Sequence, residues 1–193
     1  MTTTTTKKTV RKKPEVILDL PANPFAFEVL SLVSNQRTNA KKVEVLRKYE
    51  DLSLKTILIW NFDESIVSLL PEGEVPYAST SEQNAYSGTL SGKIEDAVSK
   101  MSEINSSSLG ASDQGKSSIR KEYHMFYNFV RGGNDSLSSL RRETMFINIL
   151  QGLHPLEAEI VCLVKDKKLQ DKYKITKEIV SEAYPDIQWG NRS

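Results

Sequence analysis

Residues 54–62 read Leu-Lys-Thr-Ile-Leu-Ile-Trp-Asn-Phe, and this densely apolar stretch decides the fold class. It holds no glycine, proline or paired turn residues, so it does not favour a β-hairpin. Its length and almost continuous apolarity instead predict a helix that is buried on most sides. The flanking segments must then supply the apolar faces that cover it.

Two helices are predicted before this stretch. Asn23-Pro24 is a helix-start signal, with asparagine as N-cap and proline at the first helical position. The apolar face of this first helix comprises Phe25, Val29, Leu32 and Val33. A polar break at residues 35–39 separates it from a second helix, whose outer face carries lysines and arginine.

The C-terminal half predicts four more helices. Residues 119–130 place apolar side chains at i, i+4, i+7, i+8 and i+11, which is typical of one amphipathic helix. Gly132 and Gly133 then predict a left-handed helix end. Start signals for the last three helices are Asp135 or Ser136, His154-Pro155, and Thr176.

The middle of the chain carries weaker signals. Residues 66–70 predict one further helical turn, and residues 71–77 predict a loop because of their prolines and glycine. Residues 85–104 predict a weak helix, and the Ser/Gly-rich residues 105–118 predict a mobile linker.

No segment alternates apolar and polar residues with period two, and no fixed repeat occurs. We therefore predict an all-α fold, with one multi-helix domain over residues 15–189. The chain has 193 residues, of which 38% are hydrophobic, enough for one core. Residues 1–14 are predicted to be a disordered basic tail.

The charges balance overall but are unevenly distributed. The chain has 26 Lys+Arg and 25 Asp+Glu, yet residues 1–14 hold five basic residues and no acidic one, and residues 61–115 hold nine acidic and two basic. A terminal basic block is typical of an arm that meets a polyanion, and equally of a solubilising tail. Both interpretations stay open.

Several classes of protein are excluded by composition. No apolar run approaches the length of a membrane span, so we expect a protein without membrane contact. A single cysteine, Cys162, excludes a disulfide framework and a cysteine-built zinc site, and two histidines make a multi-histidine metal site unfavourable.

Residues 110–117 match the phosphate-binding loop pattern G-x-x-x-x-G-K-[ST]. In a working loop Lys116 would reach the phosphates and Ser117 would hold magnesium. The buried strand that should precede Gly110 is missing, and helices rather than a parallel sheet follow. We interpret the match as a product of chance and expect no cofactor, with Gly115, Lys116 and Ser117 as the residues of a nucleotide-binding alternative.

The histidines, the cysteine and the neighbouring glutamates of the sequence are more easily explained by structural roles than by catalysis. His124 has no partner in its sequence neighbourhood, His154 stands where a capping or surface role suffices, and Cys162 lies in an apolar helix. Glu157 and Glu159 fall on different helix faces and make a poor carboxylate pair. We therefore predict that the protein is not an enzyme.

Basic residues gather near predicted helix ends at three places. Exposed N–H groups at a helix start bind phosphate, and nearby Lys or Arg add charge. The first place spans residues 37–42 and holds Arg37, Lys41 and Lys42. The second spans residues 131–134, with Arg131, Gly132 and Gly133, and is followed by Arg141 and Arg142. The third spans residues 165–177, with Lys174, Lys177 and four other lysines. The alternative is an ordinary solvated surface, and the near-zero net charge weighs against strong non-specific DNA binding.

Short motifs of this chain resemble the N-terminal DNA-binding domain of ATP-dependent DNA ligases from large contractile-tailed bacteriophages. The motifs are Val29-Leu30-Ser31-Leu32-Val33, Lys41-Lys42-Val43-Glu44-Val45-Leu46-Arg47-Lys48-Tyr49, residues 52–60, Asn128-Phe129-Val130-Arg131-Gly132-Gly133-Asn134, Leu140-Arg141-Arg142-Glu143-Thr144-Met145 and residues 175–185. The chain also resembles an uncharacterised family of small proteins from marine phages, which implies no activity.

The ligase resemblance implies an all-α domain that holds duplex DNA by its backbone across the minor groove. The positions that it assigns to DNA are Lys41, Lys42, Gly132, Gly133, Arg141, Arg142, Lys174 and Lys177, and Arg131 borders the same turn. The adenylating Lys-x-Asp-Gly motif is missing from the sequence, so this polypeptide alone cannot ligate. Residues 154–171 form an extra element, and the acidic residues 61–115 would repel DNA unless they face away.

The first hypothesis is a non-enzymatic, duplex-DNA-binding accessory protein of phage replication, repair or transcription, without base readout, in the host cytoplasm. Phage replication or transcription proteins are its further candidate partners. The second is an adaptor that binds a phage or host protein, and a variant of either is a regulator with a helix-turn-helix at residues 155–184. The third is a nucleotide-binding protein through residues 110–117.

Overall fold

The computed structural model describes residues 19–78, 87–89 and 117–192, and these residues are mainly helical. Within them the expected all-helical class is confirmed, apart from one short antiparallel ribbon. In chain order the elements are α1 (Ala26–Ser34), α2 (Asn39–Lys48), α3 (Leu52–Phe62), β1 (Pro76–Ala78), β2 (Ser87–Thr89), α5 (Ile119–Glu122), the 3-10 helix η1 (Tyr123–Phe129), α6 (Ser139–Gly152), α7 (Pro155–Lys165), α8 (Leu169–Lys172) and α9 (Lys177–Ala183).

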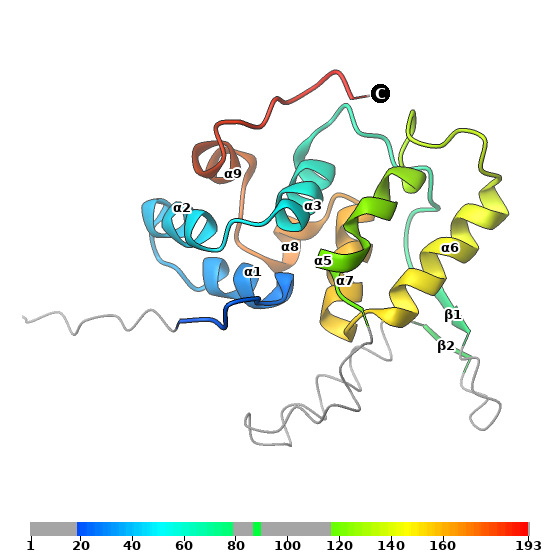
Figure 1. Cartoon of the computed structure of the whole chain (residues 1–193), viewed down its shortest axis with the longest axis horizontal. Helices are drawn as coiled ribbons and strands as arrows, with labels where there is room; N and C mark the ends of the chain where they lie inside the picture. Colours follow the sequence, from blue (N-terminus) through cyan, green and yellow to red (C-terminus); the bar gives the residue numbers. More distant parts are fainter. Residues whose placement is uncertain (1–18, 79–86, 90–116, 193) are drawn as a thin grey trace, which may run out of the picture.

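Two apolar helices, α3 and α7, form the centre of the molecule. Helix α3 packs against α5, η1 and α7, while α7 also contacts α1, α6 and α8 (Figure 1). The prediction that residues 54–62 form a mostly buried helix is confirmed, since Leu54, Ile57, Leu58 and Trp60 are all at most 2% exposed. Burial of such side chains is the main favourable term in folding.

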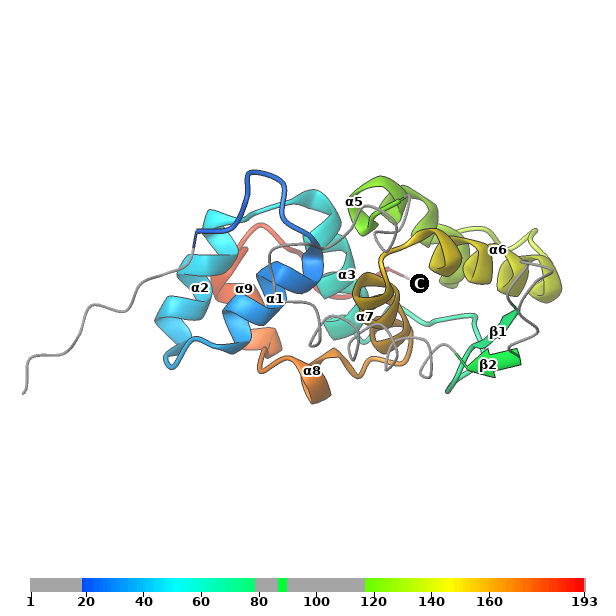
Figure 2. The same ribbon diagram turned by 90° about the horizontal axis from the view of Figure 1, so that it is seen from below.

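The remaining elements lie toward the two ends of the long axis. Helices α1, α2 and α9 gather at one end, and α6 and the β1–β2 ribbon lie at the other (Figure 2). Helix α2 packs against both α1 and α9 although α9 follows it by well over a hundred residues.

Helix α1 begins later than predicted. The Asn23-Pro24 signal suggested a start at those residues, but Phe25 is the N-cap and Ala26 the first helical residue. The Glu28 carboxylate accepts a hydrogen bond from the Phe25 N–H at 2.8 Å, which fixes the first turn from within. Leu30, which the predicted apolar face did not include, is fully buried, and the predicted Leu32 packs against the core and is partly buried.

Residues 119–130 do not form one amphipathic α-helix, which corrects the prediction. After one α-helical turn in α5 the chain tightens into η1, where side chains three residues apart align. This spacing brings Phe126 and Phe129 together against Trp60, with ring centroids 5.6 and 6.4 Å from the Trp60 ring. Tyr127, predicted to face inward, is 52% exposed.

The turn between η1 and α6 contains the predicted left-handed glycine. Gly132 has φ +78°, a conformation that favours glycine. Helix α6, however, is capped by the Ser138 hydroxyl, which accepts from the Arg141 N–H at 3.4 Å, and not by Asp135 or Ser136. The Asp135 carboxylate instead accepts from the Gly132 N–H and stabilises the turn.

The middle of the chain differs from the prediction at residues 66–70 and at the β1–β2 ribbon. Residues 66–70 are extended rather than helical, because Leu69 donates its N–H to Phe129 O at 2.8 Å and Arg131 donates to Val67 O at 2.9 Å. The predicted loop ends in β1, which pairs with β2 inside the range predicted as a weak helix. The basic tail at 1–14, most of that weak helix and the linker up to residue 116 lie outside the described residues.

The C-terminal residues are held against the end of α3. The buried Asp63 carboxylate accepts hydrogen bonds from the Gly190 N–H and from Arg192 Nε, both at 3.0 Å. The packed part of the chain therefore reaches Arg192, slightly beyond the predicted boundary at residue 189.

Gly133→Ala should strongly destabilise the fold, because the added Cβ would lie 1.9 Å from the backbone oxygen of Tyr127. We expect a loss of about 2–4 kcal/mol in the free energy of unfolding, measured by urea denaturation. Gly152→Ala is the matched control: its Cβ would meet only Ser117 Cβ at 3.8 Å, and helix propensity favours alanine by up to about 1 kcal/mol. Equal stability of the two variants would contradict the close approach at Gly133.

Candidate nucleic-acid interface

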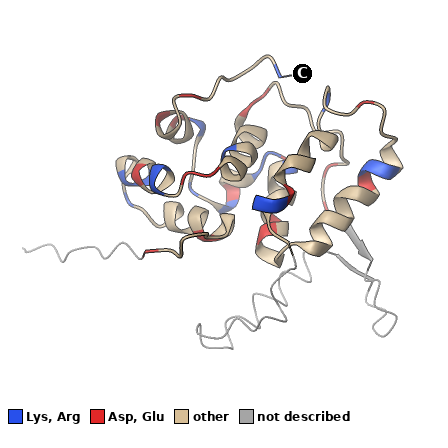
Figure 3. Cartoon of the chain, viewed as in Figure 1, with Lys and Arg blue, Asp and Glu red and all other residues tan. Residues whose placement is uncertain are grey.

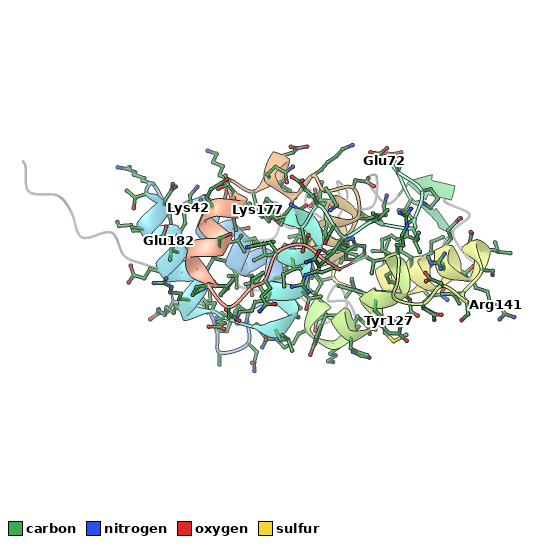
Figure 4. All side chains as sticks on the ribbon, turned by 90° about the horizontal axis from the view of Figure 1, so that it is seen from above. Lys42, Glu72, Tyr127, Arg141, Lys177 and Glu182 are labelled. Atoms are coloured by element: carbon green, nitrogen blue, oxygen red, sulfur yellow. The ribbon has the colours of Figure 1, made fainter. Side chains whose placement is uncertain are left out.

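Two of the three predicted basic sites form one surface. Lys42 on α2 donates from its ammonium group to the backbone oxygen of Lys174, in the segment before α9. Lys177, the first residue of α9, lies on the helix that packs along α2 (Figure 4). The residues that surround this junction, here called the α2/α9 patch, are Arg37, Lys41, Lys42, Lys174 and Lys177.

The start of α2 orients the N-terminal half of the patch. Thr38 is the N-cap, and its hydroxyl accepts from the Lys41 N–H at 3.4 Å. Val43 and Leu46 turn into the core, which keeps the lysines of the first turn at the surface. Helix α2 thus presents a helix N-terminus with two cationic side chains in its first turn, a combination that favours phosphate.

Buried neighbours fix the other half of the patch. Tyr173 and Ile175 are 4% and 1% exposed, so Lys174 between them must point outward. Its backbone N–H donates to Ser34 Oγ at 3.1 Å, which joins this segment to the end of α1. The Lys177 ammonium group lies 5.1 Å from the centroid of the Trp189 ring and gains a cation–π interaction there.

Helices α2 and α9 are also locked together at the opposite end of α2. Arg47 donates to Glu182 O at 2.6 Å and to Ala183 O at 3.3 Å, where the last carbonyls of α9 need partners. The Tyr184 hydroxyl donates to Leu46 O at 2.8 Å. The two halves of the patch are therefore held in a fixed relation.

The patch is only moderately positive. Glu44 on α2 and Glu178 on α9 are exposed beside its lysines, and the Glu178 pKa is lowered by its hydrogen bond with Thr176. Basic and acidic positions are interspersed along the ribbon of the helices at this end of the molecule (Figure 3). Such a surface suits weak, salt-sensitive contact with phosphates rather than tight binding.

The second predicted site, around Arg131 and Arg141, does not join the patch. Arg141 on α6 lies toward the opposite end of the long axis from Lys42 and Lys177 (Figure 4). Gly132 and Gly133 serve the turn itself, as their backbone geometry shows.

Arg142, predicted to contact DNA, is 5% exposed and faces the interior. Its guanidinium group donates to three backbone oxygens, those of Asn128 (2.8 Å), Asn134 (3.0 Å) and Leu137 (2.9 Å). All three belong to η1 and the turn that follows it. Arg142 thus organises this turn and is almost wholly withdrawn from the surface, so the prediction that it contacts DNA is wrong.

The phosphate-loop match lies almost entirely outside the described residues, which include only its last member, Ser117. The Ser117 hydroxyl donates to the Glu122 carboxylate, and its N–H donates to Gly152 O at 2.9 Å. The helix that follows, α5, has only four residues.

His154 and Cys162 take structural roles. His154 is the N-cap of α7: its Nδ1 accepts from the Leu156 N–H at 3.2 Å, as the capping interpretation predicted, but the ring is buried and stacks on Phe27. Burial lowers the pKa of His154, and it raises the pKa of the Cys162 thiol to about 12, which keeps this thiol protonated near neutral pH.

Glu157 is 1% exposed and accepts from the N–H groups of Ala26 (3.0 Å) and Ile119 (2.8 Å). Beside it lies a cavity of about 420 Å³, where Asp51 and Arg120 form an ion pair at 2.8 Å. Among the described residues, no buried side-chain nitrogen or oxygen lacks a hydrogen-bond partner, and no group of three or more His, Cys, Asp or Glu could hold a metal ion.

No helix in the described ranges is both long and apolar enough to cross a membrane.

A model described as a family of unknown function (DUF6433) matches residues 29–104 and 102–171 of the chain. No curated protein matches it, and no solved structure does.

Arg142→Ala should cost about 2–4 kcal/mol in the free energy of unfolding, because it leaves three backbone oxygens without their donor. The neighbouring Arg141→Ala should change stability by less than about 0.5 kcal/mol, because Arg141 is exposed. Urea denaturation of the two variants checks both values. A neutral Arg142→Ala would show that the guanidinium group does not hold the turn.

His154 should make stability fall as the solution is acidified. The pKa of His154 in the folded protein lies below the ordinary value of 6.5, which applies to the unfolded chain. As the pH falls through 6.5, the unfolded chain therefore binds a proton before the folded protein does, and the free energy of unfolding decreases. We expect His154→Asn, which keeps a capping side chain, to be less stable than the wild type but to lose less stability between about pH 7.5 and about pH 5.5. His124→Asn, at an exposed position, is the matched histidine-to-asparagine control. A His154→Asn pH profile as steep as those of the wild type and of this control would contradict the prediction.

Proposed function

We propose a non-enzymatic DNA-binding function for this chain, which belongs to the DUF6433 family of unknown function. In this proposal it holds the backbone of duplex DNA with the α2/α9 patch, as an accessory protein of phage replication, repair or transcription in the host cytoplasm.

The observation that carries the proposal is the contact of the Lys42 ammonium group with the Lys174 backbone oxygen. It joins two basic segments that are more than a hundred residues apart in the chain. Lysines on ordinary solvated surfaces need no such convergence, whereas a phosphate-binding surface does.

The patch favours contact with the backbone rather than with bases. Its cations stand around the first turns of α2 and α9, where N–H groups and lysines suit phosphate oxygens. Along the outer face of α2 the lysines are mixed with Glu44, and the arginine of this helix, Arg47, already donates to Glu182 O and Ala183 O and is not available for base edges. Four phosphate contacts would make binding weaken by about 100-fold between 50 and 200 mM salt.

The proposal keeps part of what the ligase resemblance implied. Lys41, Lys42, Lys174 and Lys177 stay as contacts, Arg37 joins them, and Arg142 is removed. Arg131 and Arg141 belong to the other end of the molecule. The DNA contact surface proposed here therefore includes fewer residues than the ligase resemblance implied.

Lys174→Ala combined with Lys177→Ala should weaken duplex binding and lower the slope of log K against log salt by about two. Fluorescence anisotropy with intact duplex, nicked duplex and single-stranded DNA at several salt concentrations measures both effects. The matched control is Lys121→Ala combined with Arg141→Ala, which removes the same charge from exposed positions outside the patch and should leave the slope unchanged.

Each protein is also measured without residues 1–14, because the basic tail could bind DNA by itself. Binding that disappears only with the tail, or that falls equally in both double variants, would contradict the role of the patch. Absence of binding to every DNA would contradict the proposal altogether and leave the adaptor hypothesis.

A further inference from the structure

The surface of α6 at the opposite end of the molecule is not used by the proposed function. A groove of about 600 Å³ runs between α6 and the α5–η1 segment. The two walls are antiparallel: Ser117 N–H donates to Gly152 O at one end, and Arg142 Nε donates to Asn128 O at the other.

The α6 wall is a continuous stripe that no described element covers. Its lining residues follow the helical spacing i, i+1, i+4, i+5, i+8 and i+9, and they are Leu140, Arg141, Thr144, Met145, Asn148 and Ile149. Leu140 is 76% exposed, and Met125 from η1 lies across the groove. An exposed leucine and two methionines beside small polar residues are typical of a surface that receives another helix.

The two charged residues that line the groove lie at its opposite ends. Glu122 stands at the Gly152 end, because its carboxylate accepts from the hydroxyl of Ser117. Arg141 stands in the first turn of α6, and its guanidinium group has no partner among the described residues. The groove is therefore positive at one end, apolar along its length and negative at the other end.

We propose that this groove binds the α6 helix of a second copy of the chain in an antiparallel, two-fold arrangement. A two-fold axis across the middle of α6 brings Arg141 of each copy to the Glu122 end of the other, so both charges gain a partner at once. The apolar stripe of each helix then covers that of the other.

The charge layout selects a second copy over other occupants. A surface with opposite charges at its two ends is complementary to itself only when reversed, which is what a two-fold axis does. One face of a helix about 21 Å long buries less area than a standard interface, so the dimer should be weak and dependent on concentration. Its two α2/α9 patches would lie at the far ends of the pair.

Two charge-reversal variants of the full-length protein, Arg141→Glu and Glu122→Arg, test this arrangement. Analytical ultracentrifugation over a range of concentrations should show a wild-type dimer and at least tenfold weaker association of each variant alone, because like charges then meet twice. An equimolar mixture of the two variants should dimerise again, since both contacts of the mixed pair are of opposite charge. Circular dichroism and thermal melting establish that each variant is folded.

Leu140→Asp tests the contribution of the apolar stripe on α6, and this variant should not dimerise. Lys174→Glu, in the α2/α9 patch at the opposite end of the molecule, is the control and should leave the dimer intact. A wild-type protein that stays monomeric at its highest soluble concentration overturns the proposal and leaves the groove to a different partner. A mixture of the two reversal variants that stays monomeric, or a dimer insensitive to Arg141→Glu, overturns it as well. DNA binding is not measured in this experiment, so its result is independent of the function proposed above.

Discussion

The buried carboxylate of Glu157 is the contact on which the arrangement of the helices depends. From the first turn of α7 it accepts the N–H groups of Ala26 and Ile119, at the starts of α1 and α5. Burial raises the pKa of Glu157, while the two N–H donors act in the opposite direction and favour the charged form. One side chain thus aligns three helices that are distant in sequence, and satisfies backbone donors that helix starts leave free.

Other buried charges follow the same principle. Lys165 donates from its ammonium group to Pro71 O at 2.7 Å and to Gly73 O at 3.2 Å, and Arg142 serves the turn before α6 in the same way. The helices are short, and the segments between them have backbone groups that no regular element satisfies. Among the described residues the buried charged side chains Asp63, Arg142, Glu157 and Lys165 take that role, so these four charges do not indicate a ligand.

Exposed basic side chains at the two ends of the molecule lie in different surroundings. Lys42 and its neighbours around α2 and α9 form a surface suited to phosphates, while α6 carries Arg141 beside exposed apolar side chains. In the two proposed contacts, the first surface would gain most from counterion release, and the second would gain from apolar burial with two charge pairs. A DNA contact and a self-contact can therefore exist in one small chain without competing for the same residues.

Local sequence determined the helical class, the buried helix at residues 54–62, the capping role of His154 and the left-handed Gly132, because apolar spacing and capping act over a few residues. The local pattern gave the wrong start for α1, because Glu28 accepts from the Phe25 N–H and fixes the first turn there. It also gave the wrong helix type for residues 119–130, because Phe126 and Phe129 pack against Trp60 in a 3-10 helix. It also found the lysines of the α2/α9 patch as two separate groups. Only the tertiary structure decided that these groups meet, that Arg142 turns inward while Arg141 stays outside, and that α6 leaves a groove open, since each depends on contacts between residues that the sequence keeps apart.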